Sequence, residues 1–171
     1  MKPIIIVIAF AGIIQLLSAF FTLDQSFPRS YHHFITSSTN LNNENVDGLS
    51  INDYFHSKKI AVKDGNKMEQ SRDVENYDYF KLNNGIEVAV NNKGKITRFN
   101  VTDSHLETAK GIKIGDEKKA IVQAYGDHSY FRTEQGADII AYIDKKRNIS
   151  LEFWLFDNKV KFYRLDHKSM K

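Results

Sequence analysis

The pattern of hydrophobic positions predicts mostly strands in the second half of the chain. Between Ile139 and Leu165, short apolar runs alternate with polar segments rich in Asp, Asn and Lys. Such runs, bounded by turn-forming residues, are typical of β-strands joined by hairpins. The sequence therefore predicts strands at residues 139–143, 149–156 and 160–165.

A helical spacing precedes these strands. The apolar residues recur at intervals of three and four and would form one stripe on a helix: Ala120, Ile121, Ala124 and Tyr125. Asp116 stands just before them and is able to accept the free amides of a first turn. Gly126 follows and suits the left-handed residue that ends a helix. We therefore expect a short amphipathic helix between Asp116 and Gly126.

The same plan occurs in weaker form earlier in the chain. Residues 48–53 resemble residues 111–116 at an offset of 63, and residues 95–101 resemble residues 159–165 at an offset of 64. The fold class expected is α+β, with two tandem helix-plus-three-strand antiparallel repeats at 48–110 and 111–171. They would form one sheet with the helices on one face. The elements expected in the first repeat are a helix at about 51–58 and strands at 77–82, 85–90 and 96–101.

The N-terminus contains a long uncharged segment. Residues 3–23 have no Asp, Glu, Lys or Arg, and about 20 apolar residues suffice to cross a membrane as a helix. Segment 1–23 is predicted to be a signal anchor or a signal peptide. The anchor is favoured because signal cores are usually shorter and a small-x-small cleavage site is poor here. The body would lie outside the cytoplasm, at the cell membrane or secreted if the segment is cleaved. Residues 24–47 are polar and are expected to be a spacer.

Composition narrows the possible partners. The chain has 171 residues, no cysteine, and a formal net charge of +3 that is spread along the sequence. Absence of cysteine excludes disulfides and thiolate chemistry. A mild, dispersed charge does not suggest nucleic-acid binding, which requires a basic patch. No cofactor and no metal are expected, and the oligomeric state is not indicated.

Catalytic motifs are not evident. No histidine has the i, i+4 spacing of a zinc hydrolase helix, and no nucleophile elbow is present. Glu152, which lies among apolar residues, is the most interesting acid, because a buried carboxyl with a raised pKa could transfer protons. Glu87 occupies the matching place in the first repeat, which favours an outward strand position for both. A cell-envelope hydrolase using several of His128, His167, Asp116 and Glu152 is kept as an alternative.

The motif Gly111-Ile112-Lys113-Ile114-Gly115-Asp116, followed by a helix and Tyr125-Gly126, resembles the α+β repeats of the β-lactamase-inhibitor-protein-like superfamily, which includes the outer-membrane lipoprotein SmpA. It is also similar to the N-terminal domains that precede CAP domains in secreted Gram-positive proteins. This resemblance implies a non-catalytic protein that binds protein partners. It provides no catalytic residues for this chain.

Aromatic residues on the last strands suggest where a partner would bind. In residues 150–156, alternate side chains point to opposite faces of the sheet, so Trp154 lies opposite Phe153. We expect a non-catalytic extracytoplasmic module that binds a protein or cell-envelope partner through an aromatic sheet face. Burial of this face as core, and an inhibitor or immunity-type protein, remain alternatives. The partner-binding candidates are Trp154, Phe156, Tyr142, Tyr163 and Tyr130.

Overall fold

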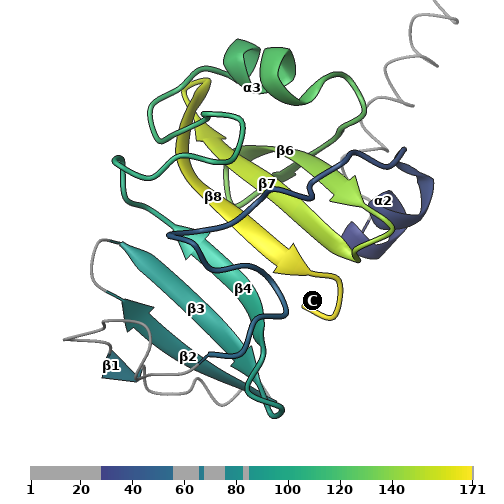
Figure 1. Ribbon diagram of the computed structural model, residues 1–171. Coiled ribbons are helices and arrows are strands. Elements are labelled where there is room, and N and C mark those ends of the chain that lie inside the picture. Colours follow the sequence, from purple (N-terminus) through teal and green to yellow (C-terminus); the bar gives the residue numbers. More distant parts are fainter. Residues whose placement is uncertain (1–27, 56–65, 68–75, 83–84, 171) are drawn as a thin grey trace, which may run out of the picture.

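The computed structural model describes residues 28–55, 66–67, 76–82 and 85–170, and the structural statements below concern this part of the chain. Its main element is one antiparallel sheet of eight strands in the order β1-β2-β3-β4-β8-β7-β6-β5 (Figure 1). The strands are β1 Asn66–Lys67, β2 Tyr77–Leu82, β3 Ile86–Asn91, β4 Ile96–Val101, β5 Tyr130–Glu134, β6 Ala137–Asp144, β7 Ile149–Phe156 and β8 Lys159–His167. Two short helices accompany it, α2 Arg29–Ile35 and α3 Lys118–Tyr125.

This architecture corrects the expected fold class. Two helix-plus-three-strand repeats with helices on one face are not formed, because the two helices pack on opposite faces of a single sheet. In α3, Ile121 belongs to the main hydrophobic core, whereas in α2 the ring of His32 stacks on Tyr130 of the second cluster, on the other face. No helix in the described residues is long and apolar enough to cross a membrane. The predicted membrane segment, residues 3–23, lies outside the described residues.

The first helix, predicted at about residues 51–58, is not formed over its first five residues. Residues 51–55 form a turn and one β-bridge. Asn52 has a positive φ of 75° and donates its amide to Ile96, while Phe55 donates to Gly94 in the β3–β4 turn. These bonds tie the segment to the hairpin instead of to a helical turn. Residues 56–58 of the prediction lie outside the described residues.

The strands themselves are arranged with a local two-fold symmetry. At the centre of the sheet, β4 pairs with β8, and the paired residues include Phe99 with Leu165, Asn100 with Arg164 and Val101 with Tyr163. An offset of 64 residues relates Phe99 to Tyr163 and Val101 to Leu165, so these residues exchange places under a two-fold rotation. The pair between them, Asn100 and Arg164, lies on the two-fold axis. The three strands β2-β3-β4 and the three strands β6-β7-β8 are therefore related halves of one sheet.

Each half is preceded by the same turn. The Asp53 carboxylate accepts a hydrogen bond from the amide of Ser50 at 2.8 Å, and the Asp116 carboxylate accepts one from Lys113 at 2.9 Å. Asp116 thus stabilises this turn. The sequence had suggested that Asp116 caps α3, and this prediction is wrong. Glu117 is the N-cap of α3 and makes no capping bond through its side chain.

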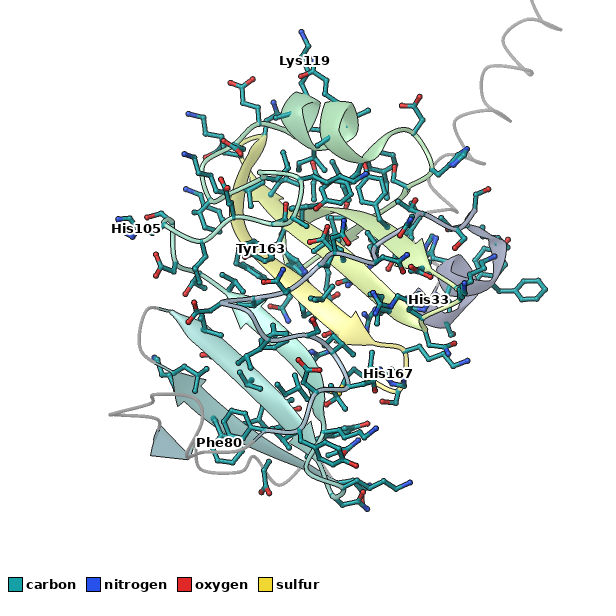
Figure 2. The ribbon with its side chains drawn as sticks, in the orientation of Figure 1. His33, Phe80, His105, Lys119, Tyr163 and His167 are labelled. Atoms are coloured by element: carbon teal, nitrogen blue, oxygen red, sulfur yellow. The ribbon has the colours of Figure 1, made fainter. Side chains whose placement is uncertain are left out.

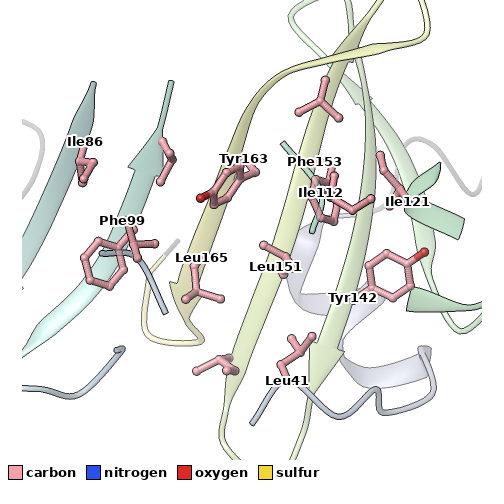
Figure 3. Packing of buried hydrophobic residues seen from close by; sticks show 14 of the residues in the cluster. Leu41, Ile86, Phe99, Ile112, Ile121, Tyr142, Leu151, Phe153, Tyr163 and Leu165 are labelled. Atoms are coloured by element: carbon pink, nitrogen blue, oxygen red, sulfur yellow. The ribbon is translucent and has the colours of Figure 1, made fainter. Parts of the chain in front are cut away.

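The helix that was predicted after this turn is present as α3. Its residues Ile121 and Tyr125 are buried, and Gly126 ends it with a φ of 85° while its amide donates to Val122. Tyr163 on β8 lies in the interior of the protein, whereas Lys119 on the outer surface of α3 points into solvent (Figure 2). Figure 3 shows the core that this helix covers. The residues it labels are Leu41, Ile86, Phe99, Ile112, Ile121, Tyr142, Leu151, Phe153, Tyr163 and Leu165.

Residues 28–47 are part of the folded body, although the sequence suggested a spacer. The segment starts with α2 on one face and passes the end of β6, where Thr39 donates its amide to Ile143 at 2.7 Å. It continues over the other face, where Leu41 and Val46 are buried in the main core. The carboxylate of Glu44 is buried there too and accepts a hydrogen bond from the Tyr125 hydroxyl at 2.7 Å.

We expect Phe99→Ala to lower the free energy of unfolding by about 3–5 kcal/mol, because a fully buried aromatic ring at the centre of the sheet leaves a cavity. Urea denaturation measures this value. The matched control is Phe156→Ala, which removes a ring that is 39% exposed and should cost under about 1 kcal/mol. Equal losses in the two variants would contradict the assignment of Phe99 to the core.

A candidate binding groove beside a buried ion network

The sheet face opposite α3 has charged side chains on four strands, of which β4, β8 and β7 are neighbours and β5 is separated from β7 by β6. On β4, β7 and β8 they alternate with residues of the main core, and on β5 Arg132 lies two positions from Tyr130 of the second cluster. They therefore all point to the same face: Arg98 on β4, Arg132 on β5, Glu152 on β7, and Arg164 and Asp166 on β8. Burying charge is costly unless it is paired. The pairing of these groups therefore decides how this face is built.

Glu152 is fully buried and lies among three guanidinium groups. Arg29 Nε is 2.7 Å from its Oε1, and its Oε2 accepts hydrogen bonds from Arg164 at 2.6 Å and from Arg132 at 3.1 Å. The Tyr130 hydroxyl donates to Oε1 at 3.0 Å. Both carboxylate oxygens are thus occupied by donors from α2, β5 and β8.

Asp166 is also fully buried and shares two of these cations, Arg29 and Arg164. Arg98 donates to both carboxylate oxygens, at 2.7 and 2.8 Å, in a bidentate pair. Arg29 Nη2 is 2.7 Å from Oδ2, and Arg164 Nε is 3.3 Å from it. Arg29 also donates to the Ser150 hydroxyl at 2.7 Å. One arginine of α2 therefore connects the helix to both buried acids.

These contacts determine the charge state of Glu152. Burial alone would raise its pKa, but the guanidinium groups of Arg29, Arg164 and Arg132 outweigh burial and hold the pKa well below its usual range. Burial and the nearby negative charge of Glu152 raise the pKa of Tyr130. The outward position favoured for Glu152 from the sequence is corrected, since the side chain is buried. A raised pKa, which proton transfer would need, is not found either.

Next to this network the face is hollowed into a groove of about 290 Å³. The groove lies over β2, β3, β4, β7 and β8 and the β5–β6 turn, away from α2. Its lining contains aromatic, amide and charged groups together with strand backbone: Tyr79, Glu87, Val88, Ala89, Arg98, Asn100, Glu134, Gln135, Trp154, Phe162 and Arg164.

Two polar atoms at the groove are buried and have no hydrogen-bond partner among the described residues. The indole of Trp154 stacks on Phe162 at 4.9 Å between ring centroids, and Arg132 and Arg164 lie 5.4 and 5.2 Å from its ring. Its Nε1–H nevertheless has no acceptor in the described part of the chain, and Asn100 Oδ1 has no donor. Buried polar groups are normally hydrogen-bonded, so these two atoms indicate a place for an external group.

The five aromatic candidates from the sequence do not form one exposed surface. Trp154 and Tyr130 lie on the ion-network face and are 6% and 4% exposed. Tyr142 and Tyr163 belong to the main core under α3, on the opposite face. Phe156 alone among the five is substantially exposed. Of the candidates, only Trp154 lines the groove.

The residues proposed for a hydrolase are also separated by the fold. Asp116 lies in the turn before α3, His128 is exposed in the loop after α3, and Glu152 is in the centre of β7. His167 is at the end of β8, where its ring hydrogen-bonds with Ser169. None of these four residues lines the groove.

The four arginines of the network, Arg29, Arg98, Arg132 and Arg164, are the candidate site residues that the sequence did not predict. A signal was present, because Arg98, Arg132 and Arg164 each sit inside an apolar or aromatic strand sequence. Only the sheet order shows that these positions meet, and Arg29 lay in the segment expected to be a spacer.

We predict that the free energy of unfolding falls as the pH drops below about 5. A glutamate whose folded pKa lies below its unfolded value of about 4.3 stabilises the fold above that pH, and the contribution is lost as the pH falls toward the folded pKa. Glu152→Gln should cost about 3–5 kcal/mol at pH 7 and flatten the acid-side slope. Urea titrations from pH 7 to acid test this, with the exposed Glu117→Gln as control. A slope unchanged by Glu152→Gln would contradict the pairing.

Comparison with known proteins adds a family to this description. A search of curated proteins and a search of solved structures each gave no match. A family model matches residues 30–157, which is most of the chain. The match contains Arg98, Arg132 and Glu152, whereas Arg29, Arg164 and Asp166 of the network lie outside it. The chain therefore belongs to the DUF1131 family, whose description is "Protein of unknown function (DUF1131)".

Proposed function

We propose that this protein is a non-catalytic, extracytoplasmic binding module that recognises a protein partner through the groove beside the ion network. The observation behind this proposal is the groove lining. It combines Arg98 and Arg164 with a buried tryptophan whose indole N–H has no acceptor in the part of the chain that the structure describes. Trp, Tyr and Arg are the residues that contribute most often to the energy of protein interfaces. The uncharged run at residues 3–23 is the sequence feature in favour of a place outside the cytoplasm.

The electrostatics of the face favour binding over proton chemistry. A general base needs a free oxygen and a pKa near the working pH. Both oxygens of Glu152 are occupied by cationic donors, and its pKa is held far below neutrality. The network instead provides rigid, preorganised cations at the edge of the groove. We therefore place the hydrolase alternative behind the binding module.

An inhibitor or immunity-type protein is the second candidate, as a special case of the same module. It would use the same groove to block the partner that it binds. The resemblance of residues 111–126 to inhibitor-like repeats supports this reading.

We expect Tyr79→Ala to reduce partner capture by at least about tenfold, because it removes an aromatic wall of the groove, and a loss of this size is usual for an interface hot spot. The measurement is quantitative mass spectrometry of proteins bound from envelope extract by the full-length protein. Phe131→Ala is the matched control, because this ring is 40% exposed, lies outside the groove lining and contacts Lys118. A partner whose capture depends on Phe131 and not on Tyr79 would refute the groove as the binding site.

A further inference from the structure

We infer that the groove binds the C-terminal residue of a polypeptide, with its free carboxylate held by Arg98 and Arg164. This inference rests on the proposed function and specifies the part of the partner that is recognised. A C-terminal residue offers a carboxylate as acceptor and a main-chain amide as donor within a few atoms of each other. The groove offers the complementary set.

The cationic side of the groove has unused donors. Arg98 donates hydrogen bonds to Asp166 through Nε and Nη2. Arg164 donates to Glu152 through Nη2, and its Nε lies near Asp166. The Nη1 group of each arginine makes no hydrogen bond within the described residues, and both arginines line the groove. A carboxylate is the group that a guanidinium fork binds best. The buried acids hold the two side chains in place, so little order is lost when a ligand binds.

Trp154 adds a neutral donor to this side. Its indole is more than nine-tenths buried, and Nε1–H has no acceptor within the described residues. An acceptor on the ligand would satisfy this buried donor. Phe162, which stacks on Trp154, presents apolar surface for the side chain of the terminal residue.

Next to these arginines the groove accepts hydrogen bonds, since Asn100 pairs with Arg164 across β4 and β8. Asn100 donates its Nδ2 to Glu87 at 3.4 Å, and its buried Oδ1 accepts no hydrogen bond from the described residues. Glu87 lines the groove and contacts no arginine within the described residues, whereas Glu134 is paired with Arg132. A bare anion would be repelled by Glu87 and would leave Asn100 Oδ1 without a donor. A terminal residue avoids both problems, because its amide N–H points away from its carboxylate.

The size of the groove agrees with a chain end. At about 290 Å³ it lies at the lower limit of ordinary ligand pockets, which span roughly 300–1,000 Å³. It suits the last one or two residues of a peptide, and it is too small for a helix or a folded domain.

The direct test compares two probes that differ only at the terminus, N-acetyl-alanyl-phenylalanine and its C-terminal amide. Trp154 is the only tryptophan in the chain, so its fluorescence in the full-length protein reports binding at the groove. We expect the acid to bind at least about tenfold more tightly than the amide, because only the acid makes charge-assisted bonds to the arginines. The inference would be overturned if the acid and the amide bound with equal affinity. It would also be overturned if the fluorescence did not respond to the acid up to about 10 mM, a concentration well above a millimolar Kd.

Two variants connect the preference to the groove. Arg98→Lys keeps the charge beside Asp166 but loses the fork, and it should reduce the preference for the acid severalfold. Asn100→Asp is nearly isosteric and adds a negative charge, so it should weaken the acid about tenfold and leave the amide little changed. Lys119→Ala, on the outer surface of α3, should change neither. Thermal unfolding of each variant identifies a loss caused by misfolding. An unchanged preference in both folded groove variants would contradict the assignment.

Failure of the carboxylate inference can be distinguished from failure of the proposed function. A partner that needs Tyr79 for capture, but still binds after its C-terminus is extended or amidated, would preserve the binding module and overturn the carboxylate inference. Failure to find any partner that needs Tyr79 would count against the module itself, whatever the probes do.

Discussion

The buried pair of acids, Glu152 and Asp166, is the constraint on which the rest of the structure depends. Two carboxylates with no exposed surface destabilise a fold by several kcal/mol each unless cations surround them. Arg29 contacts both acids, and it comes from a helix more than a hundred residues away in sequence. The network therefore holds α2 against β7 and β8 of the sheet. It also keeps several arginine side chains rigid on one face.

The duplicated sheet shows how the two halves of that face differ. Glu87 faces Asn100 across β3 and β4, just as Glu152 faces Arg164 across β7 and β8. Around Glu152, arginines and α2 complete a closed, neutralised cluster. Around Glu87 the partner is an amide, the pairing is loose, and the groove remains. One scaffold, used twice, thus gives a closed cluster around Glu152 and a loose pair at the groove around Glu87.

The sequence predicted what depends on local pattern. Gly126 ends α3 because glycine tolerates the left-handed conformation, and the apolar runs of β6, β7 and β8 are regular enough to identify. It failed where contacts over long distances decide. Asn52 takes a positive φ because its amide bonds to Ile96, which no helical pattern reveals. The role of Glu152 was misjudged for the same reason, since its arginines come from α2, β5 and β8 and meet only through the sheet order.

The central claim is that this face is built for holding charge and not for moving protons. The most direct measurement is a pH titration of the Glu152 side-chain carboxyl carbon by NMR in the folded protein. The account predicts that the resonance stays that of the ionised form down to a pH well below 4.3, roughly the usual glutamate value, until the protein unfolds. A midpoint at or above that value would mean that the arginines do not neutralise the buried acid, and the account would be wrong.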